Sequence, residues 1–126
     1  MEDSYLREDL LEIYKNPINL GKLENATVTV TDTNPMCGDE VNLAILMKGD
    51  VLVDAKFWGD ACAVSVISSS LVTEELIGKT LAEIKGFNKK DVLDLFGVPL
   101  TTSRVKCATL ILSALNLAIQ EYEKNR

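Results

Sequence analysis

Residues 41–58 read VNLAILMKGDVLVDAKFW and predict two antiparallel strands joined by a tight turn. Both arms are rich in β-branched and other apolar residues, and Lys48-Gly49-Asp50 is a short glycine-containing connection of the kind that closes a hairpin. Because side chains alternate between the two faces of a strand, we expect one face to carry Val41, Leu43, Ile45 and Met47 from the first arm and Val51, Val53, Ala55 and Phe57 from the second.

The segments before the hairpin predict a third strand and a helix. Over residues 26–34, valines alternate with threonines, as in a strand with one buried face. This strand would join the hairpin in a three-stranded antiparallel sheet. Residues 3–15 place apolar side chains on one face at helical spacing, with Asp3 as N-cap and Asn16-Pro17 as a stop.

Helices are expected after the hairpin, since the period of the apolar residues changes from two to four at Gly59. Asp60 stands where the N-cap of the first of these helices would lie, and we expect serines 68–70 on its solvated face. Further helices are expected over residues 81–84, 89–96 and 103–124. The last has a broad apolar stripe that should pack against the sheet. The sequence thus predicts one α+β domain over residues 1–126, in which a three-stranded antiparallel sheet packs against helices in two layers.

Composition excludes several classes of protein. A net charge of −6 and a pI near 4.6 oppose binding to nucleic acid or to anionic lipid. No apolar run approaches the roughly 20 residues that cross a bilayer. Three cysteines are an odd number, which argues against a disulfide framework, and the first residues do not resemble a secretory signal. We expect a cytoplasmic protein with reduced thiols, either a monomer or a weak homo-oligomer.

The three cysteines lie at the ends of expected elements, where sites are usually built. Cys37 follows the first strand, Cys62 begins a helix, and Cys107 lies in the first turns of the last helix. The positive end of a helix dipole should favour a thiolate at Cys62 and lower its pKa. The ammonium group of Lys106 would act in the same way on Cys107 if it folds back.

Taken singly, these residues leave two uses open. A free cysteine also behaves as a small hydrophobe that fills a core. Asp39 lies two residues after Cys37 and could complete four-coordination with three thiolates, but an aspartate of a surface turn would look the same. With no histidine in the chain, a metal site would have to be built from sulfur and carboxylate ligands.

Four segments carry a more specific signal: Tyr14-Lys15-Asn16-Pro17, Asn34-Pro35-Met36-Cys37-Gly38-Asp39, Gly59-Asp60-Ala61-Cys62 running into Ser68-Ser69-Ser70, and Arg104-Val105-Lys106-Cys107-Ala108-Thr109-Leu110. Together they resemble the U-type iron–sulfur cluster assembly scaffolds, the family of IscU, SufU and the N-terminal domain of NifU. The resemblance covers nearly the whole chain in order. The Asn-Pro-x-Cys-Gly-Asp block with two later cysteines is its specific signature.

The resemblance implies both a fold and a function. In this family a three-stranded antiparallel sheet is covered by helices, and Cys37, Asp39, Cys62 and Cys107 would meet at one exposed end to bind the metal or cluster. A cysteine desulfurase delivers persulfide sulfur, for which Cys107 is the expected acceptor with Lys106 as an auxiliary residue. Iron and electrons arrive, a [2Fe-2S] cluster forms, and it passes to iron–sulfur acceptor proteins.

The resemblance does not fall cleanly within one branch of the family. IscU-like members carry a histidine just before the third cysteine and SufU-like members a basic residue, as Lys106 is here. However, the stretch 81–104 is too short for the insertion of SufU-like members. The Leu-Pro-Pro-Val-Lys sequence that IscU-like members present to a chaperone is replaced by residues 100–104, LTTSR.

These features lead to an expected function and two alternatives. The sequence predicts an assembly scaffold that is not itself an enzyme. The first alternative is a zinc-dependent sulfurtransferase with Zn²⁺ on the same four ligands, and the second is a structural zinc module that serves only for interaction.

Overall fold

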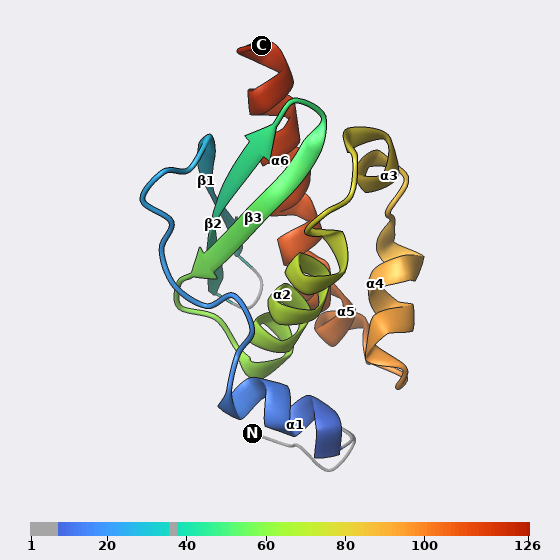
Figure 1. Cartoon of the computed structure of the whole chain (residues 1–126). Helices are drawn as coiled ribbons and strands as arrows, with labels where there is room; N and C mark the ends of the chain where they lie inside the picture. The colour runs from blue at the N-terminus through green and yellow to red at the C-terminus, as the bar shows by residue number, and fades with distance from the viewer. Residues whose placement is uncertain (1–7, 36–37) are drawn as a thin grey trace.

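The structure is a computed structural model that describes residues 8–35 and 38–126, so the predicted N-cap Asp3 and the predicted ligand Cys37 lie outside the described residues. The elements, shown in Figure 1, are α1 (Glu8–Lys15), β1 (Val28–Asn34), β2 (Asp39–Lys48), β3 (Val51–Trp58), α2 (Ala63–Leu76), α3 (Leu81–Lys85), α4 (Lys89–Phe96), α5 (Thr102–Ala108) and α6 (Leu110–Lys124). None of the helices in this part of the chain is long and apolar enough to cross a membrane.

The three strands form one antiparallel sheet, as predicted, and their order is β1-β2-β3. Val30 pairs with Leu43, which pairs in turn with Phe57. The face of β2 is confirmed, because Val41, Leu43, Ile45 and Met47 are all buried.

The predicted face of β3 is wrong at its first half. The register shifts between Leu46, which pairs with Asp54, and Met47, which pairs with Leu52, so that Val53 is an extra residue in β3. Such a bulge reverses the side-chain alternation on one side of it. Leu52 is therefore fully buried, whereas Val51 and Val53 are 37% and 38% exposed.

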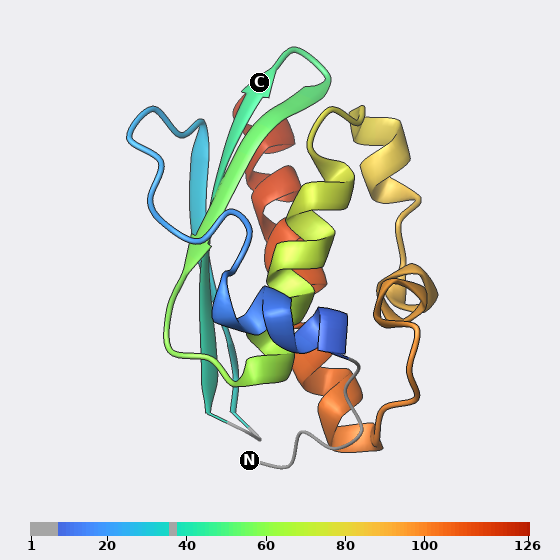
Figure 2. The ribbon, with the colours of Figure 1, turned by 60° about the horizontal axis from the view of Figure 1, so that its bottom comes forward.

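Helices α2 and α6 cover one face of the sheet, and α3 and α4 pack outside them (Figure 2). Helix α6 contacts β1 and β2, which confirms its predicted packing. Helix α2 contacts β3 and is surrounded by α1, α4, α5 and α6. The predicted solvated face for serines 68–70 is wrong, since all three are 0% exposed. The packing of most of α2 against these elements also explains why a segment rich in Val, Ile and Ser is helical, because tertiary packing overrides weak propensity.

Short local motifs delimit α3 and α4 where the sequence predicts them. Thr80 and Glu83 form a capping box at the start of α3, and Asn88 and Asp91 form another at the start of α4. Gly97, in the left-handed conformation at φ 69°, ends α4. These contacts satisfy backbone groups that a helix end otherwise leaves without partners.

The predicted single helix over residues 103–124 is divided in two. Thr109, at φ −94° and ψ 0°, separates α5 from α6. Its hydroxyl donates a hydrogen bond of 2.9 Å to the carbonyl of Val105, one turn earlier. Threonine bonds of this kind bend helices. Consequently Cys107 lies at the end of α5 rather than at the start of one long helix.

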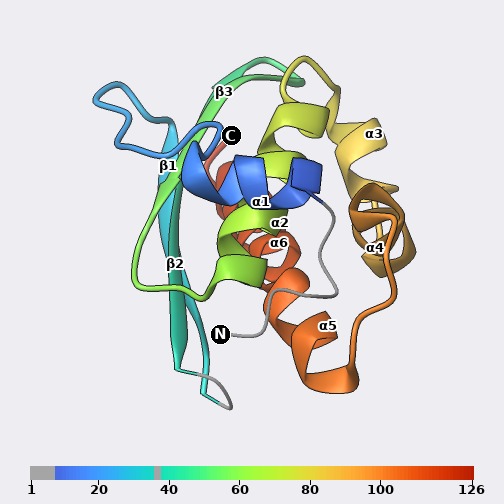
Figure 3. The ribbon, with the colours of Figure 1, turned by 90° about the horizontal axis from the view of Figure 1, so that it is seen from below.

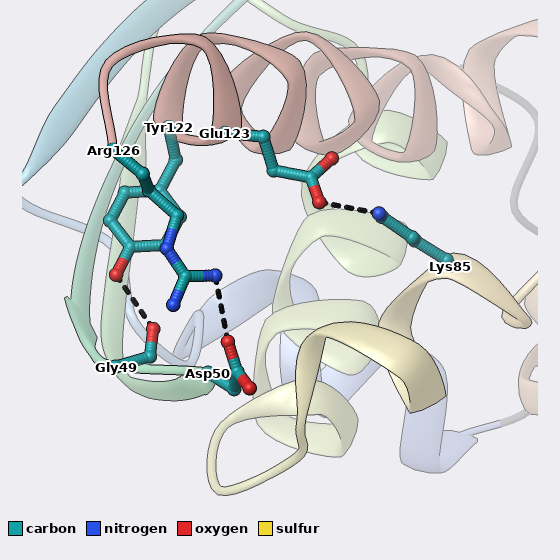
Figure 4. Close-up of polar contacts among 6 residues, drawn as sticks. All are labelled: Gly49, Asp50, Lys85, Tyr122, Glu123 and Arg126. Atoms are coloured by element: carbon teal, nitrogen blue, oxygen red, sulfur yellow. Dashed lines mark hydrogen bonds and ion pairs between the residues drawn. The ribbon is translucent and has the colours of Figure 1, made fainter.

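The far end of α6 is attached to the turn of the β2–β3 hairpin (Figure 4). The hydroxyl of Tyr122 donates a hydrogen bond of 2.6 Å to the carbonyl of Gly49. The guanidinium of Arg126 lies 2.7 Å from the carboxylate of Asp50. Nearby, an ion pair between Lys85 and Glu123 joins α3 to α6. These contacts fix α6 across the sheet at the end opposite to Cys62 and Cys107.

Candidate metal centre

The structure brings three of the predicted ligands together at one end of the molecule. Asp39 is the first residue of β2, Cys62 immediately precedes α2, and Cys107 belongs to α5. One carboxylate oxygen and the two sulfurs all lie within 4.8 Å of one another. In Figure 2 the start of β2, the first turn of α2 and α5 lie toward the bottom, and in Figure 3 the start of β2 and α5 again lie in the lower part of the view.

Asp39 reaches the site because it continues the inward face of β2. Two residues before the buried Val41, it occupies the next inward position and is only 5% exposed. Its Oδ1 accepts a hydrogen bond of 3.0 Å from the backbone N–H of Cys62. Its Oδ2 is buried without a hydrogen-bond partner in the described part of the chain. A buried carboxylate oxygen without a partner is costly, and a bound cation would satisfy it.

The segment from Gly59 to Cys62 carries the thiol back to Asp39. The N–H of Glu40 donates a hydrogen bond of 2.9 Å to the carbonyl of Asp60, so this segment lies against the start of β2. Gly59 has φ 140°, and a Cβ atom there would come within 2.4 Å of the carbonyl oxygen of Glu40. Only glycine allows this close approach in this conformation.

The predicted N-cap of α2 is wrong by two residues. Cys62 is the N-cap residue, and its side chain makes no capping hydrogen bond. The backbone of Asp60 is instead engaged with Glu40 before the helix begins. The cysteine therefore stands at the junction of loop and helix with its sulfur directed to the site rather than to the helix backbone.

The direction predicted for the pKa shift of Cys62 is also wrong. Burial raises the pKa of this thiol above its usual value, and the neighbouring carboxylate of Asp39 raises it further. The backbone of Ser65 and the thiol of Cys107 act in the opposite direction and lower this pKa in part. Desolvation and a like charge thus outweigh the helix terminus in the protein alone. A bound cation reverses this balance, since it stabilises the thiolate directly.

Cys107 both packs in the hydrophobic core and reaches the candidate metal site, the two uses of a cysteine that the sequence leaves open. It is 4% exposed and packs within the hydrophobic core, yet its sulfur lies at the site. Its carbonyl accepts a hydrogen bond of 3.2 Å from the hydroxyl of Ser65. Nothing in the sequence singles out Ser65, because a serine inside an apolar helical run gives no signal of its hydrogen-bond partner.

Lys106 is exposed beside Cys107. It lines an open pocket of about 220 Å³, together with Asn34 and Pro35 from the end of β1 and Thr109 from the α5–α6 junction. The action of the Lys106 ammonium on the Cys107 thiol stays a prediction.

Comparison with known proteins agrees with this arrangement. The family described as "NifU-like N terminal domain" matches residues 5–126. The zinc-dependent sulfurtransferase SufU of Bacillus subtilis is 33% identical, over 96% of this chain and 93% of that protein. The iron–sulfur cluster assembly scaffold protein IscU 1 of Archaeoglobus fulgidus is also 33% identical, over 91% of this chain and 74% of that protein.

A solved structure extends the similarity to three dimensions. It is the crystal structure from Fervidobacterium islandicum AW-1 of a protein described as an iron–sulfur cluster assembly scaffold for the SUF system. The TM-score is 0.79 at 30% identity, and the match covers 94% of this chain and 99% of that chain. The sheet and its covering helices are therefore the architecture of these proteins.

Proposed function

This chain belongs to the family of NifU-like N-terminal domains, and we propose that it is a scaffold on which iron–sulfur clusters are assembled before transfer to acceptor proteins. One observation carries the proposal. A carboxylate and two thiols from three separate elements lie within 4.8 Å of one another, and one oxygen of the carboxylate is buried without a partner. The relative from Archaeoglobus fulgidus, described as a scaffold of this kind, supports it.

The proposed ligands of iron are Cys37, Asp39, Cys62 and Cys107. Soft thiolates suit iron–sulfur clusters, so a [2Fe-2S] cluster is the proposed cargo. Cys37 is included because the family signature that it shares with Asp39 implies it as a ligand, and two residues of chain span at most about 7 Å. A single oxygen ligand among thiolates holds iron less firmly, and this suits a cargo that must leave.

Sulfur is proposed to arrive from a cysteine desulfurase as a persulfide. The thiolate of Cys107 attacks the outer sulfur, the S–S bond of the donor breaks, and the donor cysteine leaves as a thiolate. The outer sulfur is now bound to Cys107, and no net electrons are exchanged. The ammonium of Lys106 would favour the attacking thiolate.

A zinc-dependent sulfurtransferase is the second candidate. The relative from Bacillus subtilis bears this description, and it is similar over 96% of this chain. Zn²⁺ would take the same three thiolates and the carboxylate in a tetrahedron. Release of one thiolate from zinc would then free it to accept sulfur.

Anaerobic purification with quantified iron, sulfide and zinc separates the two candidates. For a scaffold, reconstitution with iron and sulfide yields a coloured protein, and Cys→Ser at residue 37, 62 or 107 abolishes the colour. A colourless wild-type product overturns the scaffold. Stoichiometric zinc that raises the turnover of a cysteine desulfurase would favour the second candidate instead.

A further inference from the structure

Two buried serines of α2 donate hydrogen bonds to the backbone around Cys107. The hydroxyl of Ser65 donates to the carbonyl of Cys107 at 3.2 Å, and that of Ser68 donates to the carbonyl of Ala108. Both serines are at most 1% exposed. Two hydrogen bonds therefore join α2 to the last two residues of α5.

The direction of these bonds is not the usual one for a hydroxyl in a helix. Such hydroxyls commonly donate to a carbonyl one turn earlier in their own helix. Thr73 does so in α2, since its Oγ1 lies 2.7 Å from the carbonyl of Ser69. Ser65 and Ser68 instead cross to α5, which ends at Ala108. Carbonyls at the end of a helix lack partners within the helix and need donors from outside.

Ser65 also lies near the other cysteine of the site. It is the third residue of α2, whose N-cap is Cys62, and its side chain holds the backbone of Cys107. This bond therefore connects the first turn of α2, which follows one cysteine, to the other cysteine 45 positions away by number.

We propose that Ser65 and Ser68 are positioning residues that hold Cys107 at ligand distance from Cys62 and Asp39. This inference rests on the proposed metal site. The bonds that the two hydroxyls donate to α5 go to backbone carbonyls rather than to ligand atoms. Each acts through the backbone of α5, whose place relative to α2 decides whether the three ligand atoms stay together.

Ser69 is the matched control within the same helix. It is 0% exposed, and its hydroxyl has no hydrogen-bond partner in the described part of the chain. Serine to alanine at this position removes the same atom from the same buried helix, without removing a bond to α5. Tyr122→Phe is a second control, because it removes a hydrogen bond remote from the site.

The experiment is an anaerobic titration of the full chain with Co²⁺, followed by its thiolate-to-cobalt charge-transfer and ligand-field absorption. It compares the wild type with Ser65→Ala, Ser68→Ala, the double variant, Ser69→Ala and Tyr122→Phe. Loss of a residue that orients metal ligands typically weakens metal binding about 10- to 100-fold. For the double variant we expect a loss of cobalt affinity of this size, together with shifted ligand-field bands. For each single variant we expect a smaller loss of cobalt affinity. Ser69→Ala and Tyr122→Phe should keep the wild-type affinity and spectrum.

Urea unfolding of the metal-free variants separates positioning from general destabilisation. If Tyr122→Phe loses as much stability as Ser65→Ala but keeps its cobalt affinity, the serine effect is local. Wild-type affinity and spectrum in both single variants would overturn the inference while the proposed function stands. A wild type that binds no cobalt through thiolates would overturn both. If the double variant does not fold, the single variants carry the test.

Discussion

Asp39 and Cys62 are joined by a hydrogen bond of 3.0 Å from the backbone N–H of Cys62 to Oδ1 of Asp39, across 23 positions of sequence. The bond ties the first residue of β2 to the residue that precedes α2. It also orients the carboxylate, so that Oδ2 is left for another partner. From the sequence alone, Asp39 could equally be an aspartate of a surface turn. In the structure, this hydrogen bond defines the orientation of its carboxylate.

Replacement of Asp39 by cysteine should prolong the life of a bound cluster. A fourth thiolate binds iron more firmly than an oxygen does. The measurement is the decay of visible absorption after reconstitution, with an iron chelator present. Glu40→Cys is the control, because this neighbouring side chain is exposed and points to the opposite face of β2. Equal decay rates in Asp39→Cys and wild type would contradict a role for Asp39 as a ligand.

Gly59→Ala should impair metal binding far more than Gly21→Ala. The two glycines have nearly the same conformation, φ 140° and 142°, so both variants carry similar backbone strain, about 1–3 kcal/mol. Only at Gly59 would the new Cβ meet a backbone oxygen at 2.4 Å, whereas nothing lies within 4 Å at Gly21. The clash should push the segment that carries Cys62 away from β2. Cobalt affinity and urea unfolding check this, and equal cobalt affinities would disprove it.

The metal-free protein should lose stability at alkaline pH through Cys62. The pKa of this thiol is raised in the folded state above the usual value of 9.0, so the folded state holds the proton more tightly than the unfolded state does. Its contribution is fully present below pH 9.0 and is lost as the pH rises through the folded-state pKa. Urea unfolding between neutral and alkaline pH should show a steeper loss for the wild type than for Cys62→Ser. Parallel curves would show that the thiol is not perturbed.

Tyr122→Phe should lower the free energy of unfolding by about 0.5–1.5 kcal/mol, the usual contribution of one hydrogen bond. The variant removes the bond from α6 to the carbonyl of Gly49 and leaves the ring in place. Tyr14→Phe, in an exposed position of α1, serves as the control. If thermal or urea unfolding shows no difference between the two variants, the attachment of α6 to the hairpin does not contribute to the free energy of unfolding.

Patterns of alternation and capping were enough to predict most of the fold. The hairpin over residues 41–58 and the short helices α3 and α4 have signals within a few residues, such as the Lys48-Gly49-Asp50 turn. The predictions that are wrong, for the face of β3 and for serines 68–70, depend on residues elsewhere in the chain. The bulge at Val53 depends on the pairing of β3 with β2, and the burial of serines 68–70 depends on helices that arrive from both sides.

The same distinction applies to the candidate site. Loop and helix-end positions identify Cys62 and Cys107 as candidates, and the structure brings both sulfurs to Asp39. The electrostatics could not be foreseen, because the pKa of Cys62 depends on burial and on a carboxylate from another strand. The hydrogen bonds from Ser65 and Ser68 to α5 could not be foreseen either, because their acceptors lie about 40 positions away in the sequence.

Asp39 occupies the same face of β2 as Val41, Leu43, Ile45 and Met47, so one pairing register fixes both a ligand and the hydrophobic interior. A slip of one residue would turn every side chain of this strand to the other face. It would put the carboxylate in solvent at the same moment as it unpacked the valine and leucine beside it. Metal binding at the proposed site would therefore require correctly paired strands, because a chain with a slipped β2 would lack the carboxylate ligand.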